Sequence, residues 1–431
     1  MALRLKILVV TTAALAALAP ISACSSSSTT SAASPPATSG APATSTSASA
    51  SASASASPTA PASATAAAAT GAPVTVGVLC SCSGPFGSTI ASAWSVVQAW
   101  QKSVNAAGGL NGHPVQLVEK DNGSNPGTPL TDADAIIADK VDVIVDLDIL
   151  DSLWQKAASA AKVPVIGGNF SSPAYYTDAD WYPSGQTNDS ITYSVAATAK
   201  QAGATNLADF YCAESVQCQQ SVPLIKAAGK SLGVPDVYDA SISATAPNYT
   251  AQCVAAQQAG VKAIFIGDSI SVIAKVAANC NTQGYDPIYI TEGTGFTNQA
   301  LTAPGLNGHL WSSYPVLPYF SDAPAVTAMN AVLDKYDPGL RENALTWSEF
   351  AAQAWTAGLL LAQAVKNEGS AASSPAGITA GLNAVSGATL GGFTPTLTFT
   401  AGHPHPVDCW YTGRVKNGKA SQVGGLTCEK S

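Results

Sequence analysis

Short runs rich in Val and Ile alternate along this chain with stretches in which apolar residues recur every three or four positions. The first run covers 74–79, and the stretch after it carries apolar residues at helical spacing: Trp94, Val97, Trp100 and Val104. Continuous apolar runs bounded by helices are typical of parallel strands buried on both faces of a sheet. The alternation therefore predicts an α/β fold.

The alternation forms two successive series. The first predicts strands over 74–79, 114–119, 141–145 and 163–166, with helices near 94–104, 130–138 and 152–161. The second predicts strands over 207–211, 237–242, 263–266 and 288–290, with helices over 191–202, 222–232, 249–259 and 271–279. Beyond them we expect a strand over 310–314, helices over 326–336 and 346–365, and a β-rich tail over 396–415.

Two doubly wound parallel sheets in succession imply two lobes with a ligand cleft between them. We expect lobe 1 to hold residues 74–190 and about 315–390, and lobe 2 to hold about 191–314 and 391–431. The chain then crosses between the lobes several times. Multiple crossings make a hinge that closes around a ligand.

The N-terminus has the three-part pattern of an export signal, with Arg4 and Lys6, an apolar stretch over 7–19, and small residues before Cys24. The cleavage site resembles the lipobox of bacterial lipoproteins, which implies a signal peptide over 1–23 and a lipid anchor on Cys24 at the outer face of the membrane. The alternative is an ordinary signal peptide with a cysteine nearby. The apolar stretch is too short for a comfortable membrane span.

Residues 25–73 consist only of Ser, Thr, Ala, Pro and Gly, so this segment has nothing large or apolar to bury. We expect 24–73 to form a disordered tether. Charge is sparse in the whole chain, and the net charge is −8. An acidic chain lacks the basic patch that nucleic-acid binding requires, so no nucleic-acid partner is expected.

Nine cysteines in an exported chain indicate disulfides. With Cys24 set aside, three local pairs are expected: Cys212 with Cys218, Cys253 with Cys280, and Cys409 with Cys428. Cys80 and Cys82 remain. A bridge between them would be strained, so either they pair elsewhere or this scheme is wrong. A metal site is the alternative, but no histidine lies close in the sequence.

Several segments match one family in order. They are Val74-Thr75-Val76-Gly77-Val78-Leu79, Ser83-Gly84-Pro85-Phe86-Gly87, 104–115, Asp121-Asn122, 140–145 and 162–166. Over about 74–416 the chain resembles the leucine/isoleucine/valine-binding type I periplasmic proteins. The resemblance implies a solute-binding protein that passes a small molecule to the permease of an ABC importer, without a cofactor.

The resemblance also implies ligand residues. Glu292 stands where the family carries the carboxylate that meets a ligand ammonium, and Asp268 stands where relatives place a cleft tyrosine. The loop over 211–214 lacks the Tyr-Gly signature of the family, and Tyr211 stands in its place. On the other lobe the family's loops match the following candidates: Ser83, Phe86, Ser171 and Ser172.

One loop departs from the family. Relatives grip the ligand carboxylate with a serine-rich turn after the third strand, whereas this chain has Asp146, Asp148 and Asp151 there. Acids at this place would repel a carboxylate. This weakens the expectation of a branched-chain amino acid. The expected ligand is a small polar molecule, an amino acid or a related nitrogen compound, with an amide, a polyol or an amine as alternatives.

Two other functions remain open. A sensor that reports a bound ligand to a membrane receptor would have the same fold. A serine hydrolase is the enzyme alternative, because Gly267-Asp268-Ser269-Ile270 resembles a hydrolase serine motif. That motif needs an Asp-x-x-His pair near the end of the domain, and none exists, so an enzyme is not expected.

Overall fold

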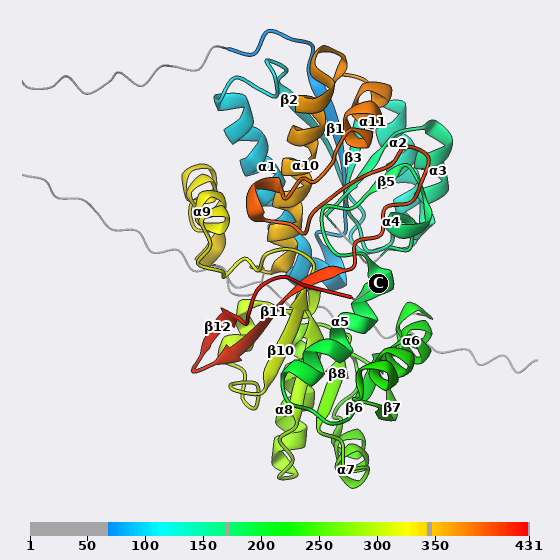
Figure 1. Ribbon diagram of the computed structural model, residues 1–431, viewed down its shortest axis with the longest axis vertical. Helices are drawn as coiled ribbons and strands as arrows, with labels where there is room; N and C mark the ends of the chain where they lie inside the picture. Colours follow the sequence, from blue (N-terminus) through cyan, green and yellow to red (C-terminus); the bar gives the residue numbers. More distant parts are fainter. Residues whose placement is uncertain (1–67, 169–171, 215, 343–346, 430–431) are drawn as a thin grey trace, which may run out of the picture. The chain divides into compact units, whose positions relative to one another are not determined.

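Two β-sheets with helices on their faces build the described part of the chain, residues 68–168, 172–214, 216–342 and 347–429 of a computed structural model (Figure 1). Residues Ala64–Ser431 form one compact unit. The predicted signal peptide, Cys24, Ser171 and nearly all of the tether lie outside the described residues. Among the residues that are described, no helix combines the length and apolar character needed to cross a membrane.

The first sheet has the strand order β2-β1-β3-β4-β5, and all its pairings are parallel. Its strands are β1 (Val74–Cys80), β2 (Val115–Asp121), β3 (Val143–Leu147), β4 (Val165–Gly167) and β5 (Trp181–Tyr182). Every residue of β3 and β4 is buried, which agrees with the continuous apolar runs in the sequence.

Helices from two parts of the chain pack around the first sheet (Figure 1). They are α1 (Gly87–Ala106), α2 (Pro129–Ala138), α3 (Gln155–Ala161), α4 (Ala174–Thr177), α10 (Glu349–Glu368) and α11 (Pro375–Asn383). Helix α10 packs on α1 so closely that a Cβ at Gly358 would lie 2.7 Å from the Trp100 ring. A glycine there allows the two helices to approach each other.

The second sheet has the order β12-β11-β10-β9-β8-β6-β7, with β13 paired to β11. Its parallel strands are β6 (Leu207–Cys212), β7 (Asp236–Ile242), β8 (Ala263–Ile266), β9 (Ile288–Glu292) and β10 (Leu310–Tyr314). The antiparallel strands are β11 (Cys409–Lys416), β12 (Lys419–Gln422) and β13 (Thr427–Cys428). The predicted parallel sheet is thus present, and the C-terminus makes it mixed.

The antiparallel edge has a local cause. Asn417 and Gly418 join β11 to β12, and both have positive φ, at 55° and 67°. A two-residue Asn-Gly turn of this kind matches the twist of a β-hairpin. The predicted tail over 396–415 was wrong in its first half, because only Cys409–Lys416 forms a strand there.

The helices of the second sheet are α5 (Asn188–Gln201), α6 (Val216–Leu232), α7 (Thr250–Gln258) and α8 (Ile270–Thr282), while α9 (Pro324–Tyr336) packs against α1. Helix α11 was not predicted. Its glycines weaken the helical pattern in the sequence. They allow close packing in the structure, because a Cβ at Gly381 would lie 2.1 Å from the carbonyl oxygen of Ala364 in α10.

The chain passes between the two sheets three times, after β5, after β10 and before β11. The connectors are hydrogen-bonded to one another. The N–H of Gln186 donates to the carbonyl of Pro315 at 3.0 Å, and the N–H of Thr187 donates to the carbonyl of Val407 at 3.0 Å. The first connector therefore joins the other two.

Candidate functional site

The loop after β1 carries the predicted residues Ser83 and Phe86, and it is fixed to the loop after β2. Asp121 Oδ1 accepts hydrogen bonds from the N–H groups of Cys82, Ser83 and Gly123 at 3.0, 3.2 and 3.0 Å. The Phe86 side chain is 44% exposed. This loop therefore presents an aromatic side chain from a fixed backbone at the carboxyl end of the strand, where open α/β sheets bind ligands.

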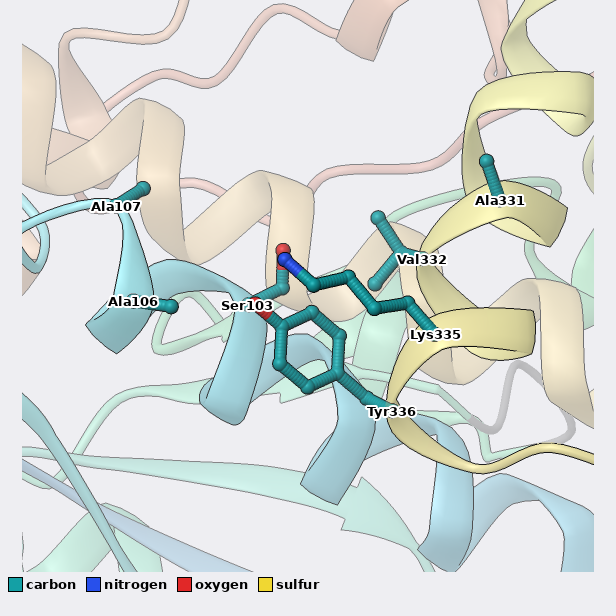
Figure 2. A pocket seen from close by; sticks show the side chains of 7 residues that line it. All are labelled: Ser103, Ala106, Ala107, Ala331, Val332, Lys335 and Tyr336. Carbon is teal, nitrogen blue, oxygen red and sulfur yellow. The ribbon is translucent and has the colours of Figure 1, made fainter. Parts of the chain in front are cut away.

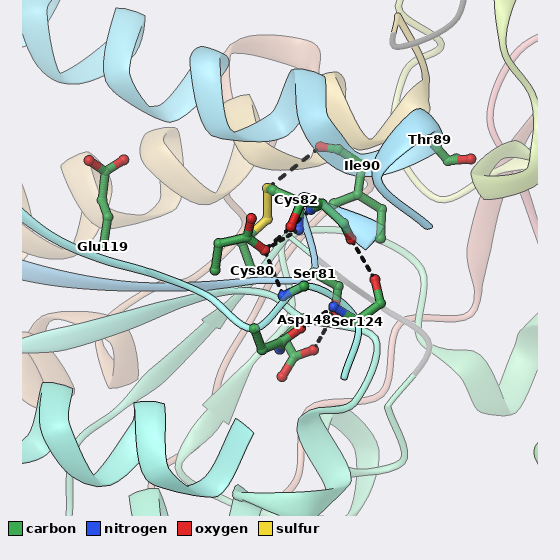
Figure 3. Close-up of a disulfide and its surroundings, with 12 residues drawn as sticks. Cys80, Ser81, Cys82, Thr89, Ile90, Glu119, Ser124 and Asp148 are labelled. Atoms are coloured by element: carbon green, nitrogen blue, oxygen red, sulfur yellow. Dashed lines mark hydrogen bonds between the residues drawn. A yellow bond between two sulfur atoms is a disulfide. The ribbon is translucent and has the colours of Figure 1, made fainter. Parts of the chain in front are cut away.

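The loop after β3 contains an acid that is fully satisfied by donors from the interior. Asp148 Oδ1 accepts from the Ser81 hydroxyl at 2.6 Å (Figure 3). The same oxygen accepts from the N–H of Leu150 at 2.9 Å, and Oδ2 accepts from Trp154 Nε1 at 2.9 Å. The side chain of Asp148 is buried. It holds the ends of β1 and β3 together.

Asp146 and Asp151 are buried beside it. Asp146 accepts from the Tyr175 hydroxyl at 3.0 Å and from the N–H of Asp148 at 2.9 Å. Burial and the neighbouring carboxyls raise the pKa of Asp146 well above its usual value, and burial raises the pKa of Asp151 to about 7. Two buried carboxyls in contact share a proton rather than both ionising.

These contacts correct one expectation from the sequence. The acids after β3 were expected to face and repel a ligand carboxylate, but all three side chains are buried and engaged with interior groups. Ser172, which was predicted as a hydroxyl donor, is also buried, and its Oγ accepts from the N–H of Ala174 at 3.2 Å. Its hydroxyl forms a further hydrogen bond with Asp151.

The second sheet brings Tyr211, Asp268 and Glu292 to the carboxyl ends of β6, β8 and β9. Parallel strands place these ends along one edge, so the three predicted residues share that edge. Tyr211 and Glu292 are half-buried. The ends of β8 and β9 meet, because a Cβ at Gly295 would lie 2.7 Å from the carbonyl oxygen of Asp268.

Asp268 has one satisfied and one unsatisfied oxygen. Its Oδ1 accepts from the N–H of Ser269 at 2.6 Å, whereas its Oδ2 is buried and has no hydrogen-bond partner among the described residues. Burial raises the pKa of Asp268, and the Ser269 N–H opposes this shift. A buried acceptor without a donor is costly, so this oxygen is suited to a ligand N–H.

Glu214 ties the loop after β6 to the loop after β7. It accepts from the Ser243 hydroxyl at 2.7 Å and from the N–H of Ala244 at 2.9 Å, while Tyr249 donates to the Ser243 carbonyl at 2.7 Å. Partial burial opposes ionisation of Glu214, but these donors outweigh it and lower the pKa of its carboxyl. Glu214 therefore has a structural partner on each side.

The first two turns of α10 contact both edges. Ser348 at the helix start donates to the carbonyl of Thr89 in α1, and a Cβ at Gly168 after β4 would lie 3.6 Å from Ala354. From the second sheet, a Cβ at Gly293 would lie 3.1 Å from Glu349 Cγ. Glu349 and Gln353 were not among the predicted site residues. Their signal in the sequence is an acid and an amide four residues apart in the mostly apolar first half of the helix.

The sulfur atoms of all three predicted cysteine pairs lie at bonding distance. Cys80 and Cys82, left open by the sequence, pair with each other in the structure (Figure 3). This bridge links the end of β1 to the loop that carries Ser83 and Phe86.

Ser269, the candidate nucleophile of the hydrolase alternative, lies with its hydroxyl 3.0 Å from that of Ser271. All four histidines lie in the described part of the chain, and none is recorded in contact with Ser269 there. Two of them, His113 and His309, contact the carbonyls of Ala72 and Pro287. His405 stacks on Tyr182.

Two hollows occur away from the predicted ligand residues. One of about 320 Å³ lies between the end of α1 and α9, where Lys335 and Tyr336 reach toward Ser103 (Figure 2). The other, of about 410 Å³, is lined by polar and aromatic side chains that include Asn298 and Trp347. Neither contains Glu292, Asp268 or Phe86.

Comparison with known families identifies the class. Residues 73–420 match the model of the periplasmic binding protein family, so the chain belongs to that family. Its two sheets are those of the type I fold within it. A search of curated protein sequences returned no significant match.

Solved structures with the same fold bind different ligands. A fatty acid ABC transporter substrate-binding protein from Thermomonospora curvata is 17% identical, with a TM-score of 0.70 over 85% of this chain and 95% of that one. A leucine-binding protein from Thermotoga maritima is 15% identical, with a TM-score of 0.68 over 82% and 98%. A solute-binding protein from R. palustris in complex with benzoate is 18% identical, with a TM-score of 0.68 over 83% and 98%. At these identities the likeness concerns the fold alone.

Proposed function

We propose that this chain is an exported solute-binding protein that captures a small polar ligand, an amino acid or a related nitrogen compound, and delivers it to the permease of an ABC importer. One observation carries the proposal: Phe86 on the first sheet, and Asp268 and Glu292 on the second, stand at the carboxyl ends of parallel strands, and α10 contacts both edges. Membership of the periplasmic binding protein family supports capture by this part of the fold.

In this proposal the two sheets are the cores of two lobes, divided near residues 190, 315 and 390, and the three connectors are the hinge. The second-sheet acids receive the N–H groups of the ligand, because a carboxylate oxygen such as Asp268 Oδ2 lacks an internal donor. The Phe86 ring covers the apolar part. Capture requires no cofactor, because binding and closure are its only steps.

We also propose that a lipid on Cys24 anchors the chain at the outer face of the membrane and that 24–73 acts as a tether. The residue types of 25–73 support this, because they offer no apolar core. As a flexible coil a tether of this length spans roughly 40 Å, enough to keep the binding unit clear of lipid head groups.

The test is a thermal-shift titration of the unit from Ala64 onward against amino acids, amides, polyamines and sugars. A ligand that binds only the folded state stabilises it by about 2.7 kcal/mol at one hundred times its dissociation constant. We expect one class to raise the melting temperature and Glu292→Ala to remove the shift. The matched control is Asp139→Ala, which changes an exposed acid at the C-terminal end of α2.

Absence of a shift with every class, in a protein that still unfolds cooperatively, would contradict capture of a small molecule. Delivery is tested separately, by uptake of the identified ligand in cells with and without the chain. Unchanged uptake would favour a sensor over an importer component.

A further inference from the structure

Helix α10 buries two polar side chains whose presence fold stability does not explain. Glu349 and Gln353 are each 0% exposed, and by hydrogen-bond geometry none of their four side-chain polar atoms has a partner in the part of the chain that is described. The backbone N–H of Tyr319 alone lies near enough to Glu349 to oppose the rise of its pKa. They lie four residues apart, so they share one face of the helix. Burial of unpaired polar groups costs free energy, which a ligand able to pair with them would recover.

This face of α10 lies where the candidate ligand loops of both sheets meet. Glu349 packs against Gly293, the residue after Glu292, and next to Tyr314 of β10. Ala354, which adjoins Gln353, packs against Gly168 after β4. The start of α10 therefore lies beside the loop that follows Glu292 and beside the loop after β4.

The loops around this face carry acids and no bases. None of the described loops after β1 to β10 contains Lys or Arg. The acids after β3 are buried and paired in the interior, so they do not count here. Glu214, Asp268 and Glu292 remain at the carboxyl ends of the second sheet. An edge with acids and no base in its loops attracts cations and disfavours ligand carboxylates.

Burial disfavours the ionised form of Glu349. Burial raises the pKa of Glu349 well above its usual value, and the side chains packed against it, Tyr314 and Tyr319, also have raised pKa values and stay neutral. Glu349 is the first residue of α10, where the helix dipole favours a negative charge. A cation brought beside it would therefore shift it to the ionised form.

From this geometry we propose that the site takes a small organic cation, with Glu349 and Gln353 as acceptors for its ammonium, amidinium or guanidinium group. The inference rests on the proposed function, since it requires capture in this cleft, and it narrows the ligand class. It separates this chain from relatives of the same fold whose named ligands are benzoate or fatty acids.

The test uses the purified full-length chain and four probes of known charge: agmatine and putrescine as cations, 1,4-butanediol as a neutral compound and benzoate as an anion. We expect a cation to bind and Glu349→Gln to weaken it at least about tenfold, since removal of one partner of a buried charge pair costs several kcal/mol. Asp209→Asn is the matched control, because it also neutralises a buried acid without a described partner.

A second readout uses the unaltered protein and does not depend on a variant that folds. Binding of a cation should release a proton from Glu349, seen as a dependence of the calorimetric enthalpy on the ionisation enthalpy of the buffer. Gln353→Leu should also weaken the cation, because it removes the amide acceptor.

Tight binding of benzoate would overturn the inference and leave small-molecule capture in place. Equal affinity of the cation in Glu349→Gln and in the unaltered chain would overturn the role of Glu349. Failure of both cations at millimolar concentration would also overturn the inference, whereas the proposed function stands or falls on the wider panel of amino acids, amides and sugars.

Discussion

The carboxyl edges of the two sheets are fixed by different means. At the first edge a buried hydrogen-bond network joins the strands, with Asp148 accepting from Ser81 and Trp154. The first edge has one disulfide besides, the Cys80–Cys82 bridge at the end of β1. The second sheet and its helices carry three, which join β6 to α6, α7 to α8 and β11 to β13. The first sheet therefore relies more on donors from its interior, and the second sheet relies more on disulfides.

The two edges show how a structural acid in a loop differs from one that is available to a ligand. Asp148 has interior donors on both oxygens, so its role is structural. Asp268 and Glu349 have buried oxygens without described donors, so they are available to a ligand. Residue type and position in the sequence do not distinguish these cases. The count of satisfied oxygens does so only together with the place in the fold, because Asp209 also has two buried oxygens without a described donor but lies inside β6.

The largest expected effect comes from breaking the first edge. Asp148→Ala leaves the Ser81 hydroxyl, the Leu150 N–H and Trp154 Nε1 without an acceptor, so we expect the free energy of unfolding to fall by about 3–5 kcal/mol. Urea unfolding of the unit from Ala64 measures it. Asp139→Ala, at an exposed acid, is the control. A loss below about 1 kcal/mol would mean that the network does not hold this edge.

The contribution of the disulfides around the second sheet is tested by removing the one that spans the most residues. Cys253 and Cys280 are 27 residues apart, and we expect their replacement by alanine to lower stability by about 3.5 kcal/mol, through release of the unfolded chain. The same change at Cys212 and Cys218, 6 residues apart, should cost about 2 kcal/mol. Non-reducing mass spectrometry checks that the links form. An equal loss at both pairs would contradict this account.

The acids of the second sheet give a pH dependence. Burial, with repulsion from neighbouring acids, raises the pKa of Asp209 to about 8, and burial with Asp239 raises the pKa of Asp236 to about 8. The folded state then holds protons that the unfolded chain has lost above about pH 4, so stability should fall as the pH rises from 4 to 8. Each group contributes at most about 1.4 kcal/mol per pH unit.

Asp209→Asn removes one of these groups, so it should flatten that slope and stabilise the protein by about 2 kcal/mol at pH 7. Denaturant unfolding at several pH values tests this, with Asp139→Asn as the exposed control. A slope unchanged by Asp209→Asn would show that this carboxyl is not the one that retains its proton.

The smallest stability effect is expected at Phe86, on the first edge. Its ring is 44% exposed, so Phe86→Ala should change the free energy of unfolding by less than about 0.5 kcal/mol. It should still weaken a ligand that has an apolar part. A large stability loss with unchanged affinity would assign Phe86 to the core instead of the site.

Most of the fold could be predicted because its strands are continuous apolar runs and its helices keep their spacing. Strands Ala263–Ile266 and Leu310–Tyr314 have the predicted bounds. Helix α11 escaped because Gly377 and Gly381 weaken its pattern, and their packing partners are known only in three dimensions. In the predicted tail over 396–415, the residues before Cys409 are of types common in strands, but they form the connector that leads to β11.

The site was less predictable. The family resemblance supplied Glu292 and Asp268, and the structure places both on one sheet edge. It misjudged the acids after β3, because the Ser81 hydroxyl that satisfies Asp148 comes from 67 residues away. Glu349 and Gln353 lie within the predicted helix over 346–365 and were not predicted as site residues, since the loops of both sheets that approach this helix are distant in sequence.

The linked connectors have a mechanical consequence. Since Gln186 is bonded to Pro315 and Thr187 to Val407, one sheet cannot turn about a single connector without moving the other two. The three connectors therefore behave as one coupled element, and in the proposed closure they would have to move together.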